Sequence, residues 1–352
     1  MKFEKLALAA LAVLGVSAPA FASEGDFNRD GNLLISDQFN NRVIEITPSG
    51  RIAWQFGLGP NDVSVGSPIG VNDAVRVGEL TLISATGAPP GSEPLCGKGC
   101  ADNRVMFVDE QGDIKWQYGN FGVTGSGHNE LNTPVQATWT ANHTVLITDQ
   151  GNQRVIEVNL HRQIVWQYGT TGVAGAKANQ LNNPNSVEKL DNGDYLIADQ
   201  SNNRAIEVNQ KGKIVAALTA GDTLSGVAFA SRLPNGDTLI TDTNNARVVE
   251  VDRGDRIVWS FVTNTQAAGN NAPAPSRAVR LENGDTVISD QFNHRVIVVD
   301  AAGRITHQYG ALDHPGYSAT SVKTGLNGPC DAKQIGDNYG LTWSDSLHLI
   351  PH

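Results

Sequence analysis

The sequence predicts an all-β fold, a six-bladed β-propeller of four-stranded antiparallel blades. Three observations predict it. A short motif recurs six times, each recurrence lies in a unit of four strand-like runs, and the C-terminal residues repeat the first strand that the N-terminal unit lacks. After residue 22 no helical periodicity lasts ten residues, so we expect sheets and not a helical repeat.

The recurring motif joins an aspartate to an arginine five residues later. Five copies are complete, and the sixth, Asp102-Asn103-Arg104, lacks the aspartate at that distance. Twelve residues after the arginine stands a tryptophan in four copies, whereas Ala216 and His307 take that place in the other two. Successive arginines are 43 to 62 residues apart, and they are Arg42, Arg104, Arg154, Arg204, Arg247 and Arg295. A constant internal register of this kind indicates one structural unit per copy.

Each unit contains four runs with the length and composition of β-strands. In the clearest unit these runs are 185–190, 195–198, 204–208 and 214–217. The Asp191-Asn192-Gly193 segment between the first two fits a tight hairpin turn, because Asn and Gly adopt the backbone angles that such turns need. Four short strands in each unit predict one propeller blade, and closing the blades into a ring leaves few sheet edges exposed.

The two ends of the chain complement each other. The N-terminal unit has little room for a first strand before residues 32–36, and the C-terminal segment 326–335 mirrors the first-strand segment 181–190. We therefore expect the C-terminal segment to pair into the first blade and to close the ring. An incomplete seventh blade is the alternative, because residues 341–345 also mimic a second strand.

The repeated pattern, as it stands in 192–214 and 283–305, resembles the NHL repeat, and the resemblance covers nearly all of the chain after residue 22. It implies a six-bladed propeller of the exported bacterial type. It does not imply one activity, because NHL-like propellers include protein-binding and RNA-binding modules, a zinc-dependent peptide lyase, and related transferases and hydrolases.

The first 22 residues follow a different pattern from the rest. Lys2 and Lys5 precede an apolar run over 6–16, and Ala20-Phe21-Ala22 offers small residues at the positions that a signal peptidase reads. We expect a signal peptide at 1–22, one propeller domain at 23–352 with a tail from about 336, and a periplasmic or secreted protein. No run of 18 apolar residues follows, so we expect no transmembrane segment in the mature chain.

The charge balance limits the partners. The chain has 26 Lys and Arg against 36 Asp and Glu, a net charge of −10 at pH 7. Phosphate backbones are bound through Lys and Arg, so we expect no nucleic acid as a partner. A protein, a peptide or an extracellular polymer is the expected partner.

Three cysteines follow the predicted signal peptide. Cys96 and Cys100 flank a flexible Gly97-Lys98-Gly99 segment, which lets the two thiols meet, and we expect them to form a disulfide in an oxidising compartment. Cys330 is then left over, and we expect a buried thiol.

Residues that recur in every blade are expected to serve the blade, because a functional site usually occurs once. We expect each motif aspartate to accept from main-chain N–H groups and to pair bidentately with its arginine, and the tryptophans to pack the outer strands. The connections between blades are long and unequal, and the second unit adds the insertion 85–101. These loops all emerge on one face, where binding is expected.

The inner strands supply a second group of candidates. Alignment places six side chains at equivalent points around the central channel: Asp73, Gln136, Ser186, Phe229, Arg277 and Asp331. Two residues further along, it adds Glu188 and Lys333. The candidate binding residues are Asp73, Gln136, Glu188, Arg277, Asp331 and Lys333. Arg277 with Asp331, and Glu188 with Lys333, form either a polar pocket or ion pairs that hold blades together, and the second interpretation is favoured.

We expect no cofactor, and two metal sites are the alternatives. Asp26, Asn28 and Asp30, with Asp37, fit the spacing of a calcium loop, although 30–37 is already explained as a blade turn and strand. A zinc site is the other alternative, from the three histidines of the loop-rich face, His128, His294 and His314.

These observations favour a non-enzymatic binding or interaction module that uses its loop-rich face. The alternative is a propeller enzyme of the lyase, hydrolase or sulfotransferase type with its site at the channel mouth, with or without a metal. No contiguous catalytic motif in the sequence supports that alternative.

Overall fold

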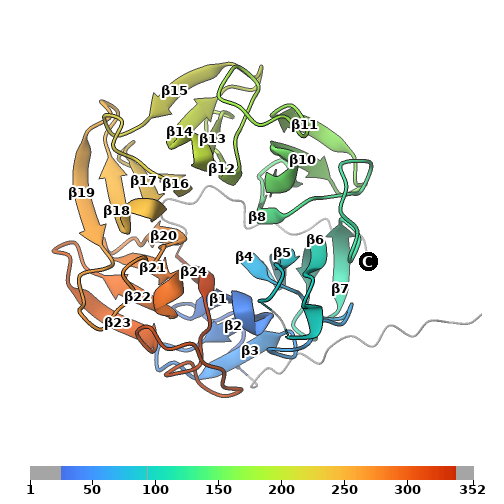
Figure 1. The fold of residues 1–352 in the computed structure, drawn as a ribbon, viewed down its shortest axis with the longest axis vertical. Helices are drawn as coiled ribbons and strands as arrows, with labels where there is room; N and C mark the ends of the chain where they lie inside the picture. The colour runs from blue at the N-terminus through green and yellow to red at the C-terminus, as the bar shows by residue number, and fades with distance from the viewer. Residues whose placement is uncertain (1–24, 93, 338–352) are drawn as a thin grey trace, which may run out of the picture.

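The computed structural model describes residues 25–92 and 94–337, which form a ring of six four-stranded antiparallel sheets (Figure 1). Blade one contains β24 (Pro329–Gln334), β1 (Leu33–Asp37), β2 (Arg42–Ile46) and β3 (Ile52–Phe56). Blade two contains β4 (Val71–Val77), β5 (Leu80–Ala88), β6 (Cys100–Val108) and β7 (Ile114–Tyr118). Blade three contains β8 (Pro134–Trp139), β9 (Thr144–Asp149), β10 (Arg154–Asn159) and β11 (Ile164–Tyr168). Blade four contains β12 (Pro184–Lys189), β13 (Tyr195–Asp199), β14 (Arg204–Val208) and β15 (Ile214–Leu218). Blade five contains β16 (Val227–Arg232), β17 (Thr238–Asp242), β18 (Arg247–Val251) and β19 (Ile257–Val262). Blade six contains β20 (Arg277–Arg280), β21 (Thr286–Asp290), β22 (Arg295–Val299) and β23 (Ile305–Gly310). The prediction of a six-bladed propeller is confirmed.

Short 3₁₀ helices are the only helical elements in the described part of the chain. Five of them connect the second and third strands of a blade: η1 (Gln38–Asn40), η3 (Gln150–Asn152), η4 (Gln200–Asn202), η5 (Thr243–Asn245) and η6 (Gln291–Asn293). The sixth, η2 (Pro94–Cys96), lies in the insertion of blade two. Within these residues no helix is long and apolar enough to cross a membrane.

The ring closes through the C-terminal strand. β24 pairs antiparallel with β1, so that Ser36 lies opposite Asp331 and Leu33 lies opposite Gln334. The first blade is therefore built from both ends of the described chain, as predicted. Residues 341–345, on which the alternative of a seventh blade rests, and the expected signal peptide lie outside the described residues.

The Asp-Arg motif fastens the blade-joining loops. In the five complete copies the arginine Nε donates to one carboxylate oxygen at 2.6 to 2.8 Å. The expected bidentate pairing is absent there, because in four copies the other oxygen accepts from a loop, as Asp37 Oδ1 does from Asn327 N at 2.8 Å. In blade two, Asp102 replaces the missing aspartate and pairs bidentately with Arg104 at 2.5 and 3.0 Å.

Tryptophans of the outer strands link four blades to the blade that follows, which agrees with their expected packing role. Each indole N–H donates to a main-chain carbonyl of the next blade: Trp54 to Glu110 at 2.9 Å, Trp116 to Leu160 at 3.0 Å, Trp166 to Gln210 at 3.3 Å and Trp259 to Ala301 at 3.2 Å. At the ring closure, the Tyr309 hydroxyl donates to the Pro48 carbonyl at 3.2 Å. These bonds and the apolar clusters between neighbouring sheets hold the ring together.

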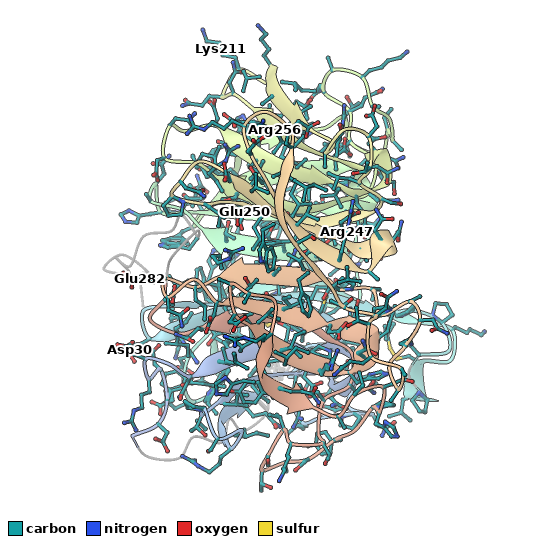
Figure 2. All side chains as sticks on the ribbon, turned by 90° about the vertical axis from the view of Figure 1, so that its left-hand side faces the viewer. Asp30, Lys211, Arg247, Glu250, Arg256 and Glu282 are labelled. Atoms are coloured by element: carbon teal, nitrogen blue, oxygen red, sulfur yellow. A yellow bond between two sulfur atoms is a disulfide. The ribbon has the colours of Figure 1, made fainter. Side chains whose placement is uncertain are left out.

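The propeller has two unlike faces. The loop face carries the blade-joining connections and the five 3₁₀ helices, and the turn face carries the tight turns between the first two and the last two strands of each blade. In side view, Asp30 and Glu282 lie on the turn face, opposite Arg247 on the loop face (Figure 2).

Candidate functional site

The innermost strands place the six aligned candidates at one level of the channel. Each candidate is paired with the same position of the second strand of its blade. In the five blades that have a 3₁₀ helix after this strand, that position lies two residues before the helix begins. The pairs are Asp331 with Ser36, Asp73 with Ser84, Gln136 with Thr148, Ser186 with Ala198, Phe229 with Thr241 and Arg277 with Ser289. The alignment made from the sequence is therefore correct in register.

Four of these side chains accept a hydrogen bond from the inner strand of the next blade. The pairs are Asp331 Oδ2 with Ala74 N at 3.3 Å, Asp73 Oδ2 with Ala137 N at 3.2 Å, Gln136 Oε1 with Val187 N at 2.6 Å and Ser186 Oγ with Ala230 N at 3.2 Å. Phe229 and Arg277 have no acceptor to offer, so the series stops at blade five. The first role of this ring of side chains is to join the blades.

A buried charge cluster lies on the side of the channel formed by blades one, two and six. Lys333 Nζ contacts Asp73 Oδ1 at 2.8 Å and also pairs with Asp331 Oδ2. Arg277 lies 3.8 Å from Asp73 and 4.0 Å from Asp331. The positive charges of the two cations equal the negative charges of the two carboxylates, and all four side chains are at most 5% exposed. Burial raises the pKa of Asp331, although Lys333 opposes this shift.

Arg277 reaches across the channel. Its guanidinium donates to Val135 O in blade three at 3.1 Å and to Ala228 O in blade five at 3.4 Å, and it lies 4.9 Å from the centre of the Phe229 ring. Contacts with blades two, three and five from a residue of blade six mean that this side chain fills the channel at its level. The geometry matches the interpretation as structural ion pairs better than that of an open polar pocket.

Glu188 is not paired with Lys333, contrary to the pairing that the sequence suggested. Glu188 belongs to blade four, opposite blade one in the ring, and its carboxylate accepts from Arg232 N of blade five at 2.8 Å. Lys333 finds its carboxylates in its own blade and the adjacent one. Asp73, Arg277, Asp331 and Lys333 are thus brought together, whereas Glu188 is not, and Gln136 bonds to blade four.

Above this cluster, the channel mouth on the loop face is lined by carboxamides. The residue after the motif aspartate is glutamine in four blades, and these residues begin the 3₁₀ helices. Gln291 Nε2 donates to Gln38 Oε1 at 2.7 Å, and Gln38 Nε2 donates to Asn72 Oδ1 at 2.9 Å. Across the mouth, Asn185 Nδ2 donates to Gln200 Oε1 at 2.9 Å. A pocket of about 690 Å³ opens here between blades one to four.

The sequence reasoning missed these glutamines because it assigned every repeated residue to the blade. The signal was visible as the Gln of Asp37-Gln38, Asp149-Gln150, Asp199-Gln200 and Asp290-Gln291. When a repeated residue lies next to the central channel, its copies from different blades come together and form one rim around the channel mouth.

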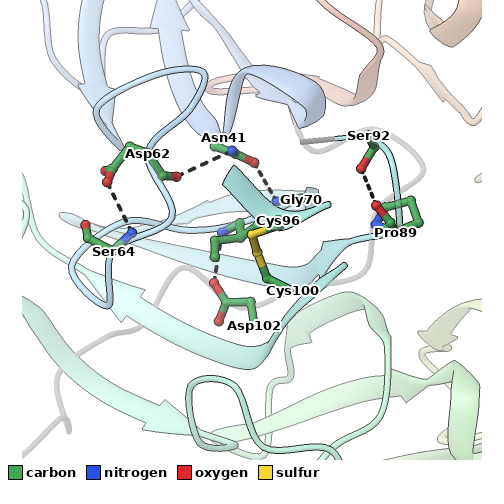
Figure 3. Close-up of a disulfide and its surroundings, with 10 residues drawn as sticks. Asn41, Asp62, Ser64, Gly70, Pro89, Ser92, Cys96, Cys100 and Asp102 are labelled. Atoms are coloured by element: carbon green, nitrogen blue, oxygen red, sulfur yellow. Dashed lines mark hydrogen bonds between the residues drawn. A yellow bond between two sulfur atoms is a disulfide. The ribbon is translucent and has the colours of Figure 1, made fainter. Parts of the chain in front are cut away.

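The insertion of blade two forms one wall of the mouth. β5 and β6 have nine residues each and extend beyond their blade, so that Thr86 to Pro89 and Lys98 to Ala101 line the pocket. The predicted disulfide between Cys96 and Cys100 is present, with the two Cα atoms 5.5 Å apart (Figure 3). It closes the tip of the insertion, and Ser92 Oγ donates to Pro89 O at 2.8 Å in the same loop. The insertion is therefore a braced part of the rim.

The remaining thiol lies just below the mouth. Cys330 is buried, as predicted, and its Sγ contacts Asn72 Oδ1 at 3.2 Å. Burial raises its pKa to about 11, so the thiol is protonated at neutral pH and is a poor nucleophile.

The candidate metal residues have other contacts. Asp26 pairs with Arg29 and Arg51, Asn28 Nδ2 donates to Gly78 O at 3.0 Å, and Asp37 pairs with Arg42. Residues 25–92 and 94–337 contain no group of three His, Cys, Asp or Glu side chains placed to hold a metal ion. His294 Nδ1 accepts from Gly328 N at 3.0 Å, and burial lowers the pKa of this histidine.

Comparison with known proteins supports the fold. No family model matches the sequence, and no curated protein is detectably similar, so the NHL resemblance is not confirmed. Among solved structures, a protein of unknown function from Bacteroides caccae is 15% identical, with a TM-score of 0.61 over 88% of this chain and 100% of that one. Virginiamycin B lyase from Staphylococcus aureus is 12% identical, with a TM-score of 0.52 over 82% of both chains. The WD40 propeller domain of Doa1 is 12% identical, with a TM-score of 0.50 over 81% of this chain and 84% of that one. Likeness at these identities extends to the propeller architecture alone.

Proposed function

We propose that this protein is an exported binding module that holds a peptide segment of a protein partner at the channel mouth of its loop face. The observation that carries the proposal is the carboxamide rim over a pocket of about 690 Å³. Carboxamides both donate and accept hydrogen bonds, as main-chain peptide groups do, so the rim can pair with an extended peptide without requiring charge.

Apolar side chains surround this rim on the loop face. They come from the blade-joining loops, from η6 and from the insertion, and they are Leu58, Val65, Leu95, Val123, Val173, Phe292 and Tyr317. Leu95 at the tip of the insertion is 66% exposed, the highest value among them. Apolar side chains around a polar centre favour a protein partner over a polysaccharide.

Two further properties fit this role. The net charge of −10 disfavours nucleic acid. The Cys96–Cys100 disulfide fits an oxidising, exported compartment, where disulfides persist.

The test is capture of a partner by the immobilised full chain from the secreted or periplasmic fraction of the source cells. Leu95→Asp is the loop-face variant, and Val215→Asp, on an exposed residue of β15, is the matched control with the same change of charge. Capture should be lost with Leu95→Asp and reduced with Gln200→Ala, and kept with Val215→Asp. Equal capture of the partner by the wild type and by both loop-face variants contradicts the proposal, and so does recovery of a polysaccharide in place of a protein.

A further inference from the structure

The boundary between blades four and five lacks an aromatic donor in the outer strand of its first blade. Four boundaries have a tryptophan there, and at the ring closure, where His307 takes the tryptophan position, Tyr309 donates to Pro48 O instead. Ala216 of β15 lies opposite Glu207 of β14, which is the register at which Trp54 lies opposite Glu45 and Trp259 lies opposite Glu250. Blade four is also the only unit with alanine, Ala205, directly after the motif arginine, where the other five have valine. Two small side chains therefore replace larger ones on the face that blade four turns toward blade five.

A cleft of about 1380 Å³ opens on the turn face, from Thr140 and Trp166 of blade three across blade four to blade five, and the place of the missing indole is part of it. Its walls include Ala205, Glu207, Ala216 and Leu218 of blade four and Arg232 and Leu233 of blade five. Trp54 is fully buried at its own boundary, whereas Ala216 is exposed. The place that an indole fills elsewhere is thus accessible from outside.

The groups that meet an indole at other boundaries are present here. At the first boundary, Arg76 lies 5.1 Å from the Trp54 ring centre and pairs with Glu45 at 2.7 Å. At the fifth, Arg280 lies 4.8 Å from the Trp259 ring centre and pairs with Glu250.

At the fourth boundary, Arg232 pairs with Glu207 at 3.0 Å, and no aromatic ring among the described residues lies against its guanidinium. Arg232 Nε is buried and makes no hydrogen bond within the described chain. The cation and its carboxylate are therefore in place for an aromatic ring that residues 25–92 and 94–337 do not supply there.

The hydrogen-bond acceptor is also in place. The carbonyls that receive the four indole N–H groups stand six residues after the motif arginine, and in blade five that residue is Arg253. No residue of the described segments donates to the Arg253 carbonyl. The boundary is held by a different link, because the Asp255 carboxylate accepts from Thr219 N at 2.9 Å and from Ala220 N at 2.7 Å. This link joins blades four and five without filling the cleft.

We propose that this cleft binds the indole side chain of a tryptophan presented by a peptide or protein ligand. The indole N–H donates to the Arg253 carbonyl, the ring lies against the Arg232 guanidinium, and Glu207 holds that guanidinium in place. The site lies on the turn face and is separate from the channel mouth, so either proposal can fail without the other.

The probe is N-acetyl-tryptophanamide, and its binding to the full chain is followed by ligand-observed NMR. Ala216→Trp should weaken binding at least tenfold and should raise the Tm, because the new side chain fills the cleft. Ala217→Trp is the matched control and should leave binding unchanged, because Ala217 is the adjacent exposed residue and strand alternation places its side chain on the other face of β15. The N1-methylated probe, which cannot donate, should bind about 2- to 12-fold more weakly, which corresponds to the loss of one net hydrogen bond.

Three results would overturn the proposal: binding that survives Ala216→Trp, an equal loss of binding in Ala217→Trp, and binding of the probe by Trp343→Ala but not by the wild type. If Ala216→Trp does not fold, Ala216→Leu replaces it and must also weaken binding. Trp343 of this chain lies outside the described residues, so Trp343→Ala completes the set. Equal binding by wild type and Trp343→Ala supports an external ligand, and binding by Trp343→Ala alone means that the chain itself supplies the indole.

Discussion

Replacing Lys333 with methionine tests the buried charge cluster directly. The substitution keeps most of the length of the side chain and removes the cation that contacts both Asp73 and Asp331. The two carboxylates then keep their main-chain donors, and Arg277, at 3.8 and 4.0 Å, is the one cation left in the cluster. Removing one partner from a buried ionic group costs about 3–5 kcal/mol, which at about 2 °C per kcal/mol for a domain of this size lowers the Tm by roughly 6–10 °C.

The pH dependence gives this variant a distinctive signature. Burial already raises the pKa of Asp331 above 3.8, and loss of Lys333 raises it further. A carboxyl with a raised pKa holds its proton more tightly in the folded state, so its protonation stabilises the fold as the pH falls through the raised value. The stability deficit of Lys333→Met should therefore shrink as the pH falls from neutral through the raised pKa of Asp331 and the carboxyl pair takes up a proton.

Thermal and urea unfolding across this pH range measure both effects. Lys323→Met is the control, since Lys323 is exposed, and it should change stability by less than about 0.5 kcal/mol at every pH. Adding Asp331→Asn to Lys333→Met should recover part of the loss, because one buried charge is removed. A Lys333→Met protein as stable as wild type, with the same pH profile, would refute the reasoning that these four groups form one buried cluster.

Three further predictions follow from the blade contacts. Trp54→Ala should cost about 3–5 kcal/mol of unfolding free energy, and Trp259→Ala distinctly less in the same urea titration, because Trp54 is fully buried and Trp259 only partly. Equal losses would contradict the packing described. Cys96→Ser with Cys100→Ser should speed proteolytic cleavage within 89–99 while changing the Tm little, since the bridge closes only a short loop worth about 2 kcal/mol; a collapse of the whole fold would contradict a local role. His294 should titrate in NMR below its ordinary pKa of 6.5, because burial disfavours the charged ring, and stability should fall as the pH drops below 6.5, when the ring is protonated and can no longer accept from Gly328 N. An unshifted titration would contradict the burial of this ring.

The blade count, the strand register and the disulfide could be predicted because each rests on a local pattern. The equivalence of Asp73 and Arg277, for example, follows from strand alternation and a constant repeat. The predicted ring closure places Lys333 in blade one, beside blades two and six, and yet its partners were not predicted. Which carboxylates its side chain contacts depends on how far side chains of different blades extend into the channel, and a strand pattern does not give that distance.

Two other features were present in the sequence and were not interpreted. The repeated Gln38 and its equivalents read as blade residues, although their place at the axis assembles them into one rim. Ala216 takes the position of a repeated tryptophan, and a small residue at that repeated packing position leaves space in the cleft between blades four and five. In both cases the physical consequence depends on what lies across the boundary, which a single repeat does not contain.

The pairing of β24 with β1 also bears on the order in which this protein acquires its structure. Leu33 and Gln334 are neighbours in space and lie at opposite ends of the described sequence. Until β24 is available, β1 presents an open edge, and the channel lacks both Asp331 and Lys333. Contacts of such separation form slowly, because a long loop must close before they contribute. A chain that emerges progressively from a membrane pore would hold five complete blades and one open edge, and would therefore depend on protection from intermolecular strand pairing until its last strand arrives.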